Sequence, residues 1–302
     1  MSKRGYISRY LLILKKLKAK PYSTYVELQE YIENQFEYLQ MQNEGSSKRT
    51  LQRDFNDIRN TFGIDIEYSK SLKGYFISQD ETENMNFQRM IEAFDMYNSL
   101  NISKDLTPFV HLEKRRPQGT EHLFGLIHAI KNKLQIIFDY QKFWEENSSP
   151  RLCEPYALKE FKSRWYLIAR DVNDGLVKTF GLERLSNIDI TKGAFEFPET
   201  FNIGDNFRYC FGVINLSGQV PEEIILSFDP IQGKYIKSLP LHETQVIIVD
   251  NEDELQVKLT LFVTLDFIME ILSHGDYVKV IAPQSLVDRI KVELNNALIQ
   301  YK

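Results

Sequence analysis

The spacing of apolar residues changes its period near residue 134, and this change constrains the fold more than any other feature of the chain. Before that point, apolar side chains mostly recur at steps of three and four residues, as on one face of a helix. After it, several short runs alternate apolar and polar residues, as in strands. A length of 302 residues allows about two or three domains. The sequence therefore predicts an α+β multidomain protein.

The first 79 residues predict three helices followed by a β-hairpin. The apolar spacing indicates helices over residues 6–17, after Ser23 or Thr24, and after Ser47, whose hydroxyl makes it a good N-cap. Two short alternating runs around a polar turn then indicate a hairpin. This order predicts a winged helix-turn-helix. The alternative is a small helical domain whose basic face is only exposed to solvent.

The third predicted helix has an apolar face and a basic, polar face. Its apolar residues are spaced four, three and four apart, at Leu51, Phe55, Ile58 and Phe62. The other faces carry Arg, Gln and Asn, which contact base edges and phosphates in the major groove of DNA, and the hairpin tip adds two lysines. The candidate DNA-binding residues are Ser47, Lys48, Arg49, Thr50, Gln52, Arg53, Asn56, Lys70 and Lys73.

The same helix carries a specific sequence signature. Residues 47–58 read Ser-Lys-Arg-Thr-Leu-Gln-Arg-Asp-Phe-Asn-Asp-Ile, and Phe62-Gly63-Ile64 follows. This segment resembles the recognition helix of bacterial winged-helix regulators of the DeoR-like type, in which a capping Ser precedes Arg-Thr and then Gln-Arg-Asp. The resemblance favours the winged helix-turn-helix over the plain helical alternative.

Charge is distributed unevenly along the chain. The total is 37 Lys and Arg against 42 Asp and Glu, a net charge of −5. The first 79 residues hold 13 basic and 9 acidic residues, a net charge of +4, so the remainder carries −9. A basic N-terminal segment followed by an acidic remainder indicates nucleic-acid binding, although a basic face that is only exposed to solvent would give the same net charge.

Residues 80–133 predict linker helices that join this segment to the rest of the chain. Apolar stripes occur over 87–97 and 123–130. Between them lies the basic cluster Lys114-Arg115-Arg116. This cluster either contacts the DNA backbone or belongs to an exposed connection, and we favour the connection.

Five short predicted strands between residues 134 and 191 indicate a small barrel. In the central strand, Arg164, Tyr166 and Arg170 share one face, and Trp165 and Leu167 share the other. The first face could bind an anionic ligand. It could equally be the outer face of the barrel.

The order of motifs in this region resembles a known family. Trp165-Tyr166-Leu167 follows Pro155-Tyr156-Ala157-Leu158 and precedes Phe180-Gly181-Leu182-Glu183-Arg184-Leu185, with Tyr140 ending the first strand. This set resembles the WYL domain, an Sm-like five-stranded β-barrel named for that tripeptide. The resemblance implies a barrel that senses nucleic acid or nucleotides through aromatic and basic residues. Carried over by position, the candidate ligand-binding residues are Tyr140, Tyr156, Tyr166, Arg170 and Arg184, whereas Trp165 is expected to pack.

Two positions depart from the family pattern. Gly181 stands where the family often has an arginine, and Glu183 stands where it has an aspartate. The first departure removes a cation from the predicted ligand site.

The last part of the chain predicts strands and helices in the order βαββαβα, which is typical of a ferredoxin-like sandwich. It resembles the C-terminal extension often appended to WYL domains, including the turn Ser273-His274-Gly275 and the proline, Pro283, that starts the final helix. The predicted domains are 1–79, winged helix-turn-helix; 80–133, helical linker; 134–215, WYL barrel; and 216–302, C-terminal extension.

Motifs for catalysis, metals and membranes are missing from the sequence. It contains no phosphate-binding GxxxxGK[ST] loop, no GxGxxG and no HExxH. Its five His and two Cys show no metal-ligand spacing, and no apolar run reaches the ~18 residues needed to span a bilayer. We therefore expect no enzyme activity, cofactor or metal, no membrane association, and a cytoplasmic location.

Together these features predict a transcriptional regulator. It would bind double-stranded DNA as a homodimer, and a nucleotide or single-stranded nucleic acid bound to the WYL barrel would modulate operator binding. Two alternatives remain. One is an accessory nucleic-acid-binding subunit of a DNA-processing or defence system without its own regulon. The other is an interaction module that has lost DNA binding.

Overall fold

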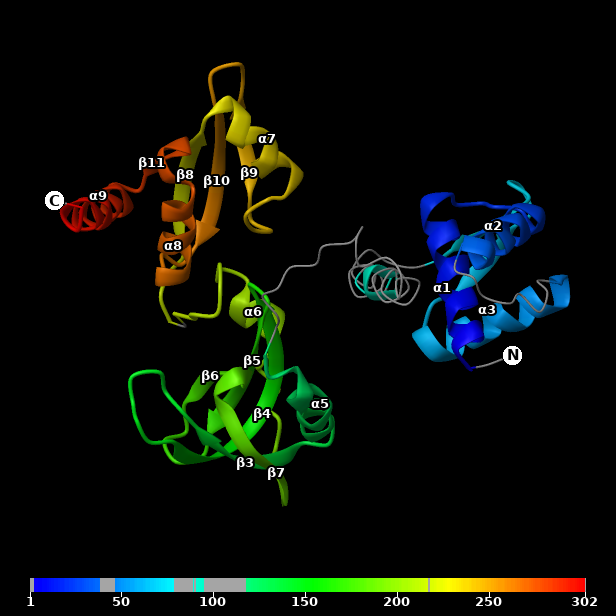
Figure 1. The fold of residues 1–302 in the computed structure, drawn as a ribbon, viewed down its shortest axis with the longest axis horizontal. Helices are drawn as coiled ribbons and strands as arrows, with labels where there is room; N and C mark the ends of the chain where they lie inside the picture. The colour runs from blue at the N-terminus through cyan, green and yellow to red at the C-terminus, as the bar shows by residue number, and fades with distance from the viewer. Residues whose placement is uncertain are drawn as a thin grey trace. The chain divides into compact units, whose positions relative to one another are not determined.

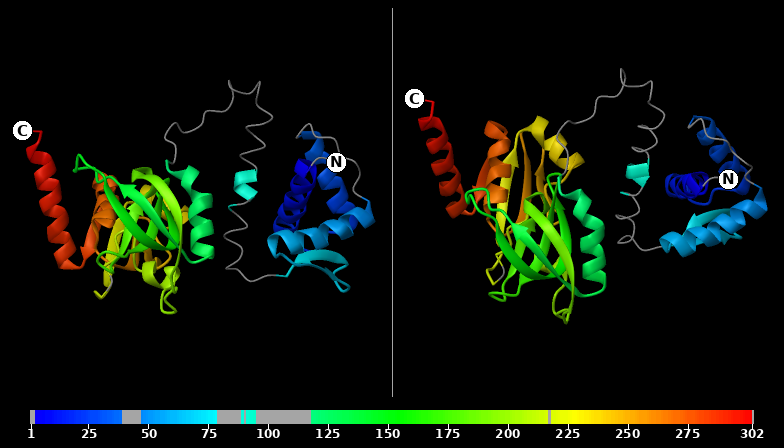
Figure 2. Two further views of the ribbon diagram at one scale, coloured as in Figure 1. Left: turned by 90° about the horizontal axis from the view of Figure 1, so that it is seen from below. Right: turned by 60° about the horizontal axis from the view of Figure 1, so that its bottom comes forward.

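The protein forms two compact units, Met1–Glu113 and Lys114–Lys302. They are seen in a computed structural model (Figures 1 and 2). The described residues are 3–38, 47–78, 89, 91–94, 118–216 and 218–301. The basic cluster Lys114-Arg115-Arg116 and most of the predicted linker lie outside them. Among the described helices, none is both long enough and apolar enough to cross a membrane.

The three predicted helices and the hairpin of the N-terminal unit are confirmed. The elements are α1 (Lys3–Ala19), α2 (Tyr25–Tyr38), α3 (Lys48–Phe62), β1 (Ile66–Ser69) and β2 (Gly74–Ile77). The helices bury their apolar stripes against one another in a single core, which includes Leu28, Ile32, Leu51 and Ile58. Residues 91–94 are helical, and their apolar side chains pack on this core.

The hairpin is fastened to the connection between α1 and α2. The Tyr75 backbone N–H donates to the Ser23 carbonyl oxygen at 2.8 Å. A Cβ on Gly74 would lie only 1.9 Å from the Tyr22 carbonyl oxygen, so only glycine permits this approach. The hairpin therefore has a fixed place relative to the helices of its unit.

The C-terminal unit begins with helix α5 and a five-stranded antiparallel sheet. The elements are α5 (Leu123–Lys131), β3 (Leu134–Tyr140), β4 (Ser149–Phe161), β5 (Arg164–Asp171), β6 (Val177–Gly181) and β7 (Leu185–Ala194). Helix α5 lies along the sheet (Figure 2), and Leu126 and Ala129 are buried with Phe138 and Leu167 in one core. The segment predicted to be a linker helix thus packs as part of the sheet domain. Within its predicted apolar stripe, Ile127 is exposed.

The five predicted strands are confirmed, but they do not close into a barrel. The strand order is β6-β5-β4-β3-β7, so β6 and β7 form the two edges. A single 3-10 turn, Leu182–Arg184, separates these strands along the chain. It carries the chain from one edge of the sheet to the other, where β7 pairs with β3 instead of β6.

The second half of this unit has the predicted βαββαβα order. After α6 (Ile203–Phe207), the elements are β8 (Glu222–Phe228), α7 (Pro230–Ser238), β9 (Val246–Asp250), β10 (Leu255–Leu261), α8 (Leu265–Ser273), β11 (Val278–Ala282) and α9 (Gln284–Ile299). The sheet order is β11-β8-β10-β9, all antiparallel, which is the ferredoxin-like arrangement (Figure 1). The predicted stripe of α9 is only half buried, because Leu286 and Ile290 enter the core whereas Leu294 and Leu298 are exposed.

The segment between the two sheets joins them through contacts of its own. The Phe211 ring lies 5.8 Å from Phe161 of β4 and 5.4 Å from Phe267 of α8, between ring centroids. Lys162, in the β4–β5 turn, forms an ion pair with Glu270 of α8 at 2.7 Å. The Phe211 contacts hold the segment between the two sheets, the ion pair joins β4–β5 to α8 directly, and the segment lines two pockets.

Candidate DNA-binding surface and ligand pockets

Helix α3 starts at the N-cap expected from the sequence and ends at Gly63. The Ser47 hydroxyl accepts a hydrogen bond from the Thr50 backbone N–H at 3.1 Å, as an N-cap does. Gly63 ends the helix with φ of 69°, and its N–H donates to the Arg59 carbonyl oxygen. The register of the candidate DNA-binding face is therefore set by local sequence.

The nine candidate DNA-binding residues all lie in the N-terminal unit, and eight are exposed. Thr50 is the exception, because it is half buried and its hydroxyl lies 2.8 Å from that of Ser47. Lys70 and Lys73 flank the hairpin tip, where the Leu72 N–H donates to the Ser69 hydroxyl. The exposed candidates are Ser47, Lys48, Arg49, Gln52, Arg53, Asn56, Lys70 and Lys73.

The acidic residues of α3 point inward and fix the helix to α1. Asp54 accepts hydrogen bonds from Arg9 at 2.5 and 2.8 Å, and both side chains are fully buried. The Tyr10 hydroxyl donates to Asp57 at 2.8 Å, and burial together with this contact raises the Tyr10 pKa to about 12. Of the Gln-Arg-Asp motif, only Gln52 and Arg53 thus face solvent. The sequence interpretation placed Tyr10 in the apolar stripe of α1 and predicted neither of these contacts.

The five candidate ligand-binding residues do not form a single site. Tyr166 and Arg184 line one pocket, and Tyr156 and Arg170 line another. Tyr140 lines neither, because its side chain is buried in the core of the sheet.

The first pocket, which we call the Arg184 pocket, has a volume of about 430 Å³. It lies between β5, β6 and the segment that joins the two sheets. The Arg184 guanidinium lies 5.1 Å from the centroid of the Tyr140 ring and 4.9 Å from that of Phe143, so two aromatic rings hold it in place. Its Nε is buried and makes no hydrogen bond. Burial raises the pKa of the Tyr166 phenol on the same wall.

Glu183 occupies the space beside this arginine. Its Oε1 accepts from Arg164 at 3.1 Å and lies 3.7 Å from Arg184 Nε, and the side chain is only 9% exposed. A Cβ on Gly181 would lie 2.9 Å from Arg184 and from both Glu183 oxygens. A side chain at position 181 would therefore displace the Glu183 carboxylate or the Arg184 guanidinium.

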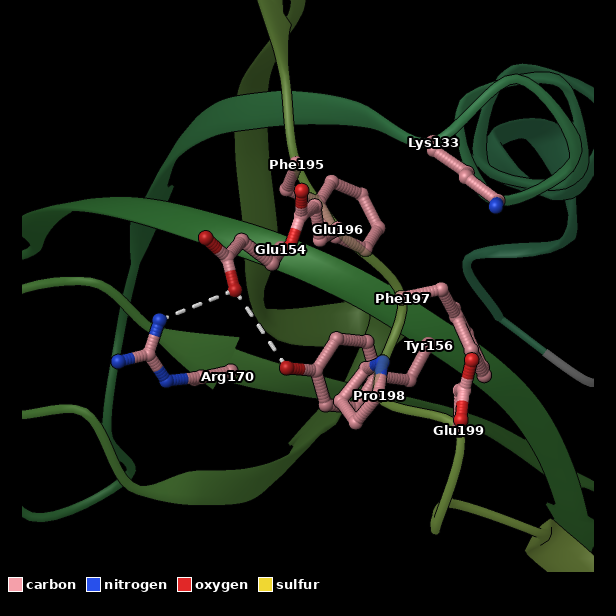
Figure 3. A pocket seen from close by; sticks show the side chains of 9 residues that line it. All are labelled: Lys133, Glu154, Tyr156, Arg170, Phe195, Glu196, Phe197, Pro198 and Glu199. Carbon is pink, nitrogen blue, oxygen red and sulfur yellow. Dashed lines mark hydrogen bonds and ion pairs between the residues drawn. The ribbon is translucent and has the colours of Figure 1, made fainter.

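The second pocket, the Glu154 pocket, has a volume of about 810 Å³ and is shown in Figure 3. Glu154 lies at its centre, accepting from Arg170 at 3.1 Å and from the Tyr156 hydroxyl at 3.4 Å. Two further carboxylates, Glu196 and Glu199, line the same pocket. The carboxylates outnumber the basic residues here, and Glu154 already pairs with Arg170. This pocket consequently does not suit an anion.

Nothing in the described part of the chain suggests a metal centre. Within residues 3–38, 47–78, 118–216, 218–301 and the few described between them, no three His, Cys, Asp or Glu side chains are grouped to hold an ion. Both cysteines are buried, and burial raises the pKa of the Cys153 thiol to about 12. A buried thiol that stays protonated is a core residue and not a nucleophile.

Two solved structures are similar to the chain as a whole. One is proteasome accessory factor B/C (PafBC) of Arthrobacter aurescens, at 19% identity and a TM-score of 0.33, covering 95% of this chain and 46% of that chain. The other is a CRISPR Cas-related protein, at 9% identity and a TM-score of 0.40, covering 99% of this chain and 85% of that chain. This chain thus spans less than half the length of the PafBC chain. Because both TM-scores are low, we draw no argument from either similarity.

Two family models match the C-terminal unit. Residues 121–190 match the family described as WYL domain, which includes α5 and strands β3 to β6. Residues 221–298 match the family described as WCX domain, which corresponds to the ferredoxin-like half. A comparison with curated proteins found no match. The chain therefore contains a WYL domain followed by a WCX domain.

Proposed function

We propose that this protein is a DNA-binding transcriptional regulator whose WYL domain binds a small anionic effector. The observation that carries this proposal is α3. It presents Arg49, Gln52 and Arg53 to solvent, while the buried Asp54–Arg9 pair fixes the helix from behind. An exposed row of Arg and Gln on a rigidly held helix suits both base edges and phosphates.

The hairpin supports the same interpretation. Three helices followed by a docked hairpin have the order of a winged helix-turn-helix, with α3 as recognition helix and the hairpin as wing. Lys70 and Lys73 are exposed beside the hairpin tip, where they would contact phosphates on the flank of the α3 site. We infer that residues 1–79 form this DNA-binding domain.

The Arg184 pocket is the better of the two effector sites. Its arginine is held by two rings and no carboxylate is among the residues that line it, whereas three glutamates line the Glu154 pocket. A nucleotide or a single-stranded nucleic acid would supply the anion. The strand order β7-β3-β4-β5-β6, read from the opposite edge of the sheet, is that of an open Sm-like barrel, which supports the expected WYL fold.

A homodimer would present two α3 helices to two half-sites of an operator. An effector changes operator binding only if it binds one arrangement of this dimer more tightly than another. Whether the effector activates or represses depends on which arrangement it binds more tightly.

Genome-wide footprinting of the full-length protein tests the proposal. Discrete, reproducible sites are expected, and a gel shift on those sites should lose affinity steeply with salt, because each phosphate contact releases counterions. Uniform weak binding without discrete sites would contradict a regulator and favour an accessory nucleic-acid-binding subunit.

A paired set of variants locates the DNA surface. Arg49→Ala/Arg53→Ala should abolish discrete footprints and reduce the slope of log affinity against log salt by about 0.9 for each lost phosphate contact. Lys192→Ala/Lys279→Ala removes two exposed positive charges from the C-terminal unit and is the matched control. If both double variants weaken binding equally, DNA does not bind through α3.

A further inference from the structure

Arg53 occupies the middle of the exposed row on α3. Arg49 lies four residues before it and Asn56 three residues after it, so the three side chains share one face of the helix. The Arg53 guanidinium carbon lies 5.7 Å from the centroid of the Tyr6 ring in α1, within the ~6 Å of a cation–π interaction. The central side chain of the row is thus held by a residue outside α3.

The Tyr6 ring is itself fixed in place. It packs on the core of the N-terminal unit. The Arg9 guanidinium carbon lies 5.5 Å from the centroid of this ring, and Arg9 donates two hydrogen bonds to Asp54. Because Asp54 neutralises Arg9, the ring can attract Arg53 without collecting two uncompensated cations. Asp54 directly follows Arg53 in α3, so the buried ion pair and the ring hold successive residues of the same helical turn.

An arginine held by a ring keeps the donors that a base requires. The cation–π attraction uses the charge of the guanidinium and not its N–H groups. The donors of Arg53 can therefore form the bidentate contact with O6 and N7 of guanine, which is the commonest specific contact of arginine in the major groove. A side chain that is already held in place also loses less conformational entropy when it binds.

We propose that Tyr6 is a positioning residue, which holds Arg53 for bidentate recognition of one guanine in the bound DNA site. Tyr6 acts through Arg53 and not by contact with DNA. This inference rests on the proposed DNA-binding function. It adds the base that the middle of α3 reads, and the residue of another helix on which this selectivity depends.

Modified DNA and the unchanged full chain provide the first test. In a site identified by footprinting, each guanine is replaced in turn by 7-deazaguanine, which lacks the N7 acceptor. At one position the replacement should weaken binding of the unchanged protein but not of Arg53→Ala. Changing that G·C pair to A·T should weaken binding about 5- to 150-fold, the range for one bidentate contact. If no replacement has an effect that depends on Arg53, the guanine assignment is wrong.

Three variants then test the ring. Tyr6→Leu should reduce the preference for G·C over A·T at this position by about 2- to 5-fold, because one exposed cation–π contact is lost. Tyr6→Phe keeps the aromatic face and should retain the preference. Tyr31→Leu is the matched control, because Tyr31 packs on the same core and has Lys16 at 5.2 Å over its ring, with both residues outside α3. Thermal unfolding of every variant is measured alongside, and Tyr31→Leu should lower stability without changing the preference.

Base preference separates positioning from a purely structural role. If Tyr6 only supports the core, Tyr6→Leu weakens binding to the G·C and A·T sites by the same factor, and the inference is overturned. Equal loss of preference in Tyr6→Phe and Tyr6→Leu also overturns it, because the aromatic face would then have no part. In both cases, discrete footprints that require Arg49 and Arg53 leave the proposed function intact. If the unchanged protein gives no discrete footprints, the proposed function fails and this inference fails with it.

Discussion

Replacing Asp54 by alanine should strongly destabilise the N-terminal unit without affecting the C-terminal one. Asp54 and Arg9 are both fully buried and share two hydrogen bonds, at 2.5 and 2.8 Å. Removing the carboxylate takes away two hydrogen bonds and one member of a buried ion pair, which destabilises a protein by about 3–5 kcal/mol. A domain of this size is typically stable by only about 5–15 kcal/mol, so the loss is a large fraction of the total.

Two spectroscopic signals distinguish the units in urea. The only two tryptophans, Trp144 and Trp165, both lie in the C-terminal unit, so their fluorescence reports on that unit alone. Far-UV circular dichroism also reports on the helices of the N-terminal unit. Asp54→Ala should shift a helical transition to lower urea and leave the fluorescence midpoint where it was.

A compensated variant supplies the control. In Arg9→Met/Asp54→Leu, an apolar pair replaces the ion pair, and stability should return to within about 1 kcal/mol of the unchanged protein. The reasoning is refuted if Asp54→Ala alone shifts the helical transition by less than about 1 kcal/mol, the range of a surface ion pair. Loss of DNA binding in Asp54→Ala should thus follow unfolding, whereas in Arg49→Ala/Arg53→Ala it should occur in a folded protein.

Three further substitutions test particular features of the fold by urea denaturation. Gly74→Ala should destabilise the N-terminal unit by about 2–3 kcal/mol, because its Cβ would lie 1.9 Å from the Tyr22 carbonyl oxygen. Gly125→Ala should instead stabilise the C-terminal unit by about 0.5–1 kcal/mol, because this exposed position of α5 has room for a methyl group. Burial raises the pKa of the Asp171 carboxyl, but the Lys178 hydrogen bond and neighbouring donors outweigh burial and hold it below its ordinary value. The charged carboxylate therefore stabilises the folded protein above the unfolded pKa of about 4, and this stabilisation is lost as pH falls through the folded pKa. Asp171→Asn should lower the free energy of unfolding by about 2 kcal/mol at pH 7 and by progressively less below pH 4.

Local features of the fold could be predicted from the sequence because each depends on a few neighbouring residues. The Ser47 hydroxyl caps the start of α3, Gly63 adopts the left-handed backbone conformation that ends it, and the apolar spacing predicted the correct buried face. The same spacing contained a signal that was missed. Asp54 falls three residues after Leu51, at the edge of the apolar stripe, and Arg9 directly precedes Tyr10 in α1. Opposite charges beside two apolar faces that meet indicate an internal ion pair.

The division of the candidate ligand residues into two pockets could not be predicted in this way. Arg170 and Tyr166 share one face of β5, so strand alternation alone places them together. The segment after β7 then folds over this face. Its Phe201 ring packs on Tyr156, with 5.0 Å between the ring centroids, and also lines the Arg184 pocket. Contacts between residues so far apart along the chain leave no periodic pattern.

The Arg184 pocket links the two domains of the C-terminal unit, and this link suggests which element an effector influences. One wall comes from β5 and β6 of the WYL domain, and the other is the segment at 213–215, fastened to α8 through Asp266. A ligand that contacts both walls ties them together. It therefore favours arrangements in which the WYL and WCX domains keep the spacing found here, and disfavours arrangements in which they separate. If the homodimer has two arrangements that differ in this spacing, the effector selects between them without contacting the DNA-binding unit.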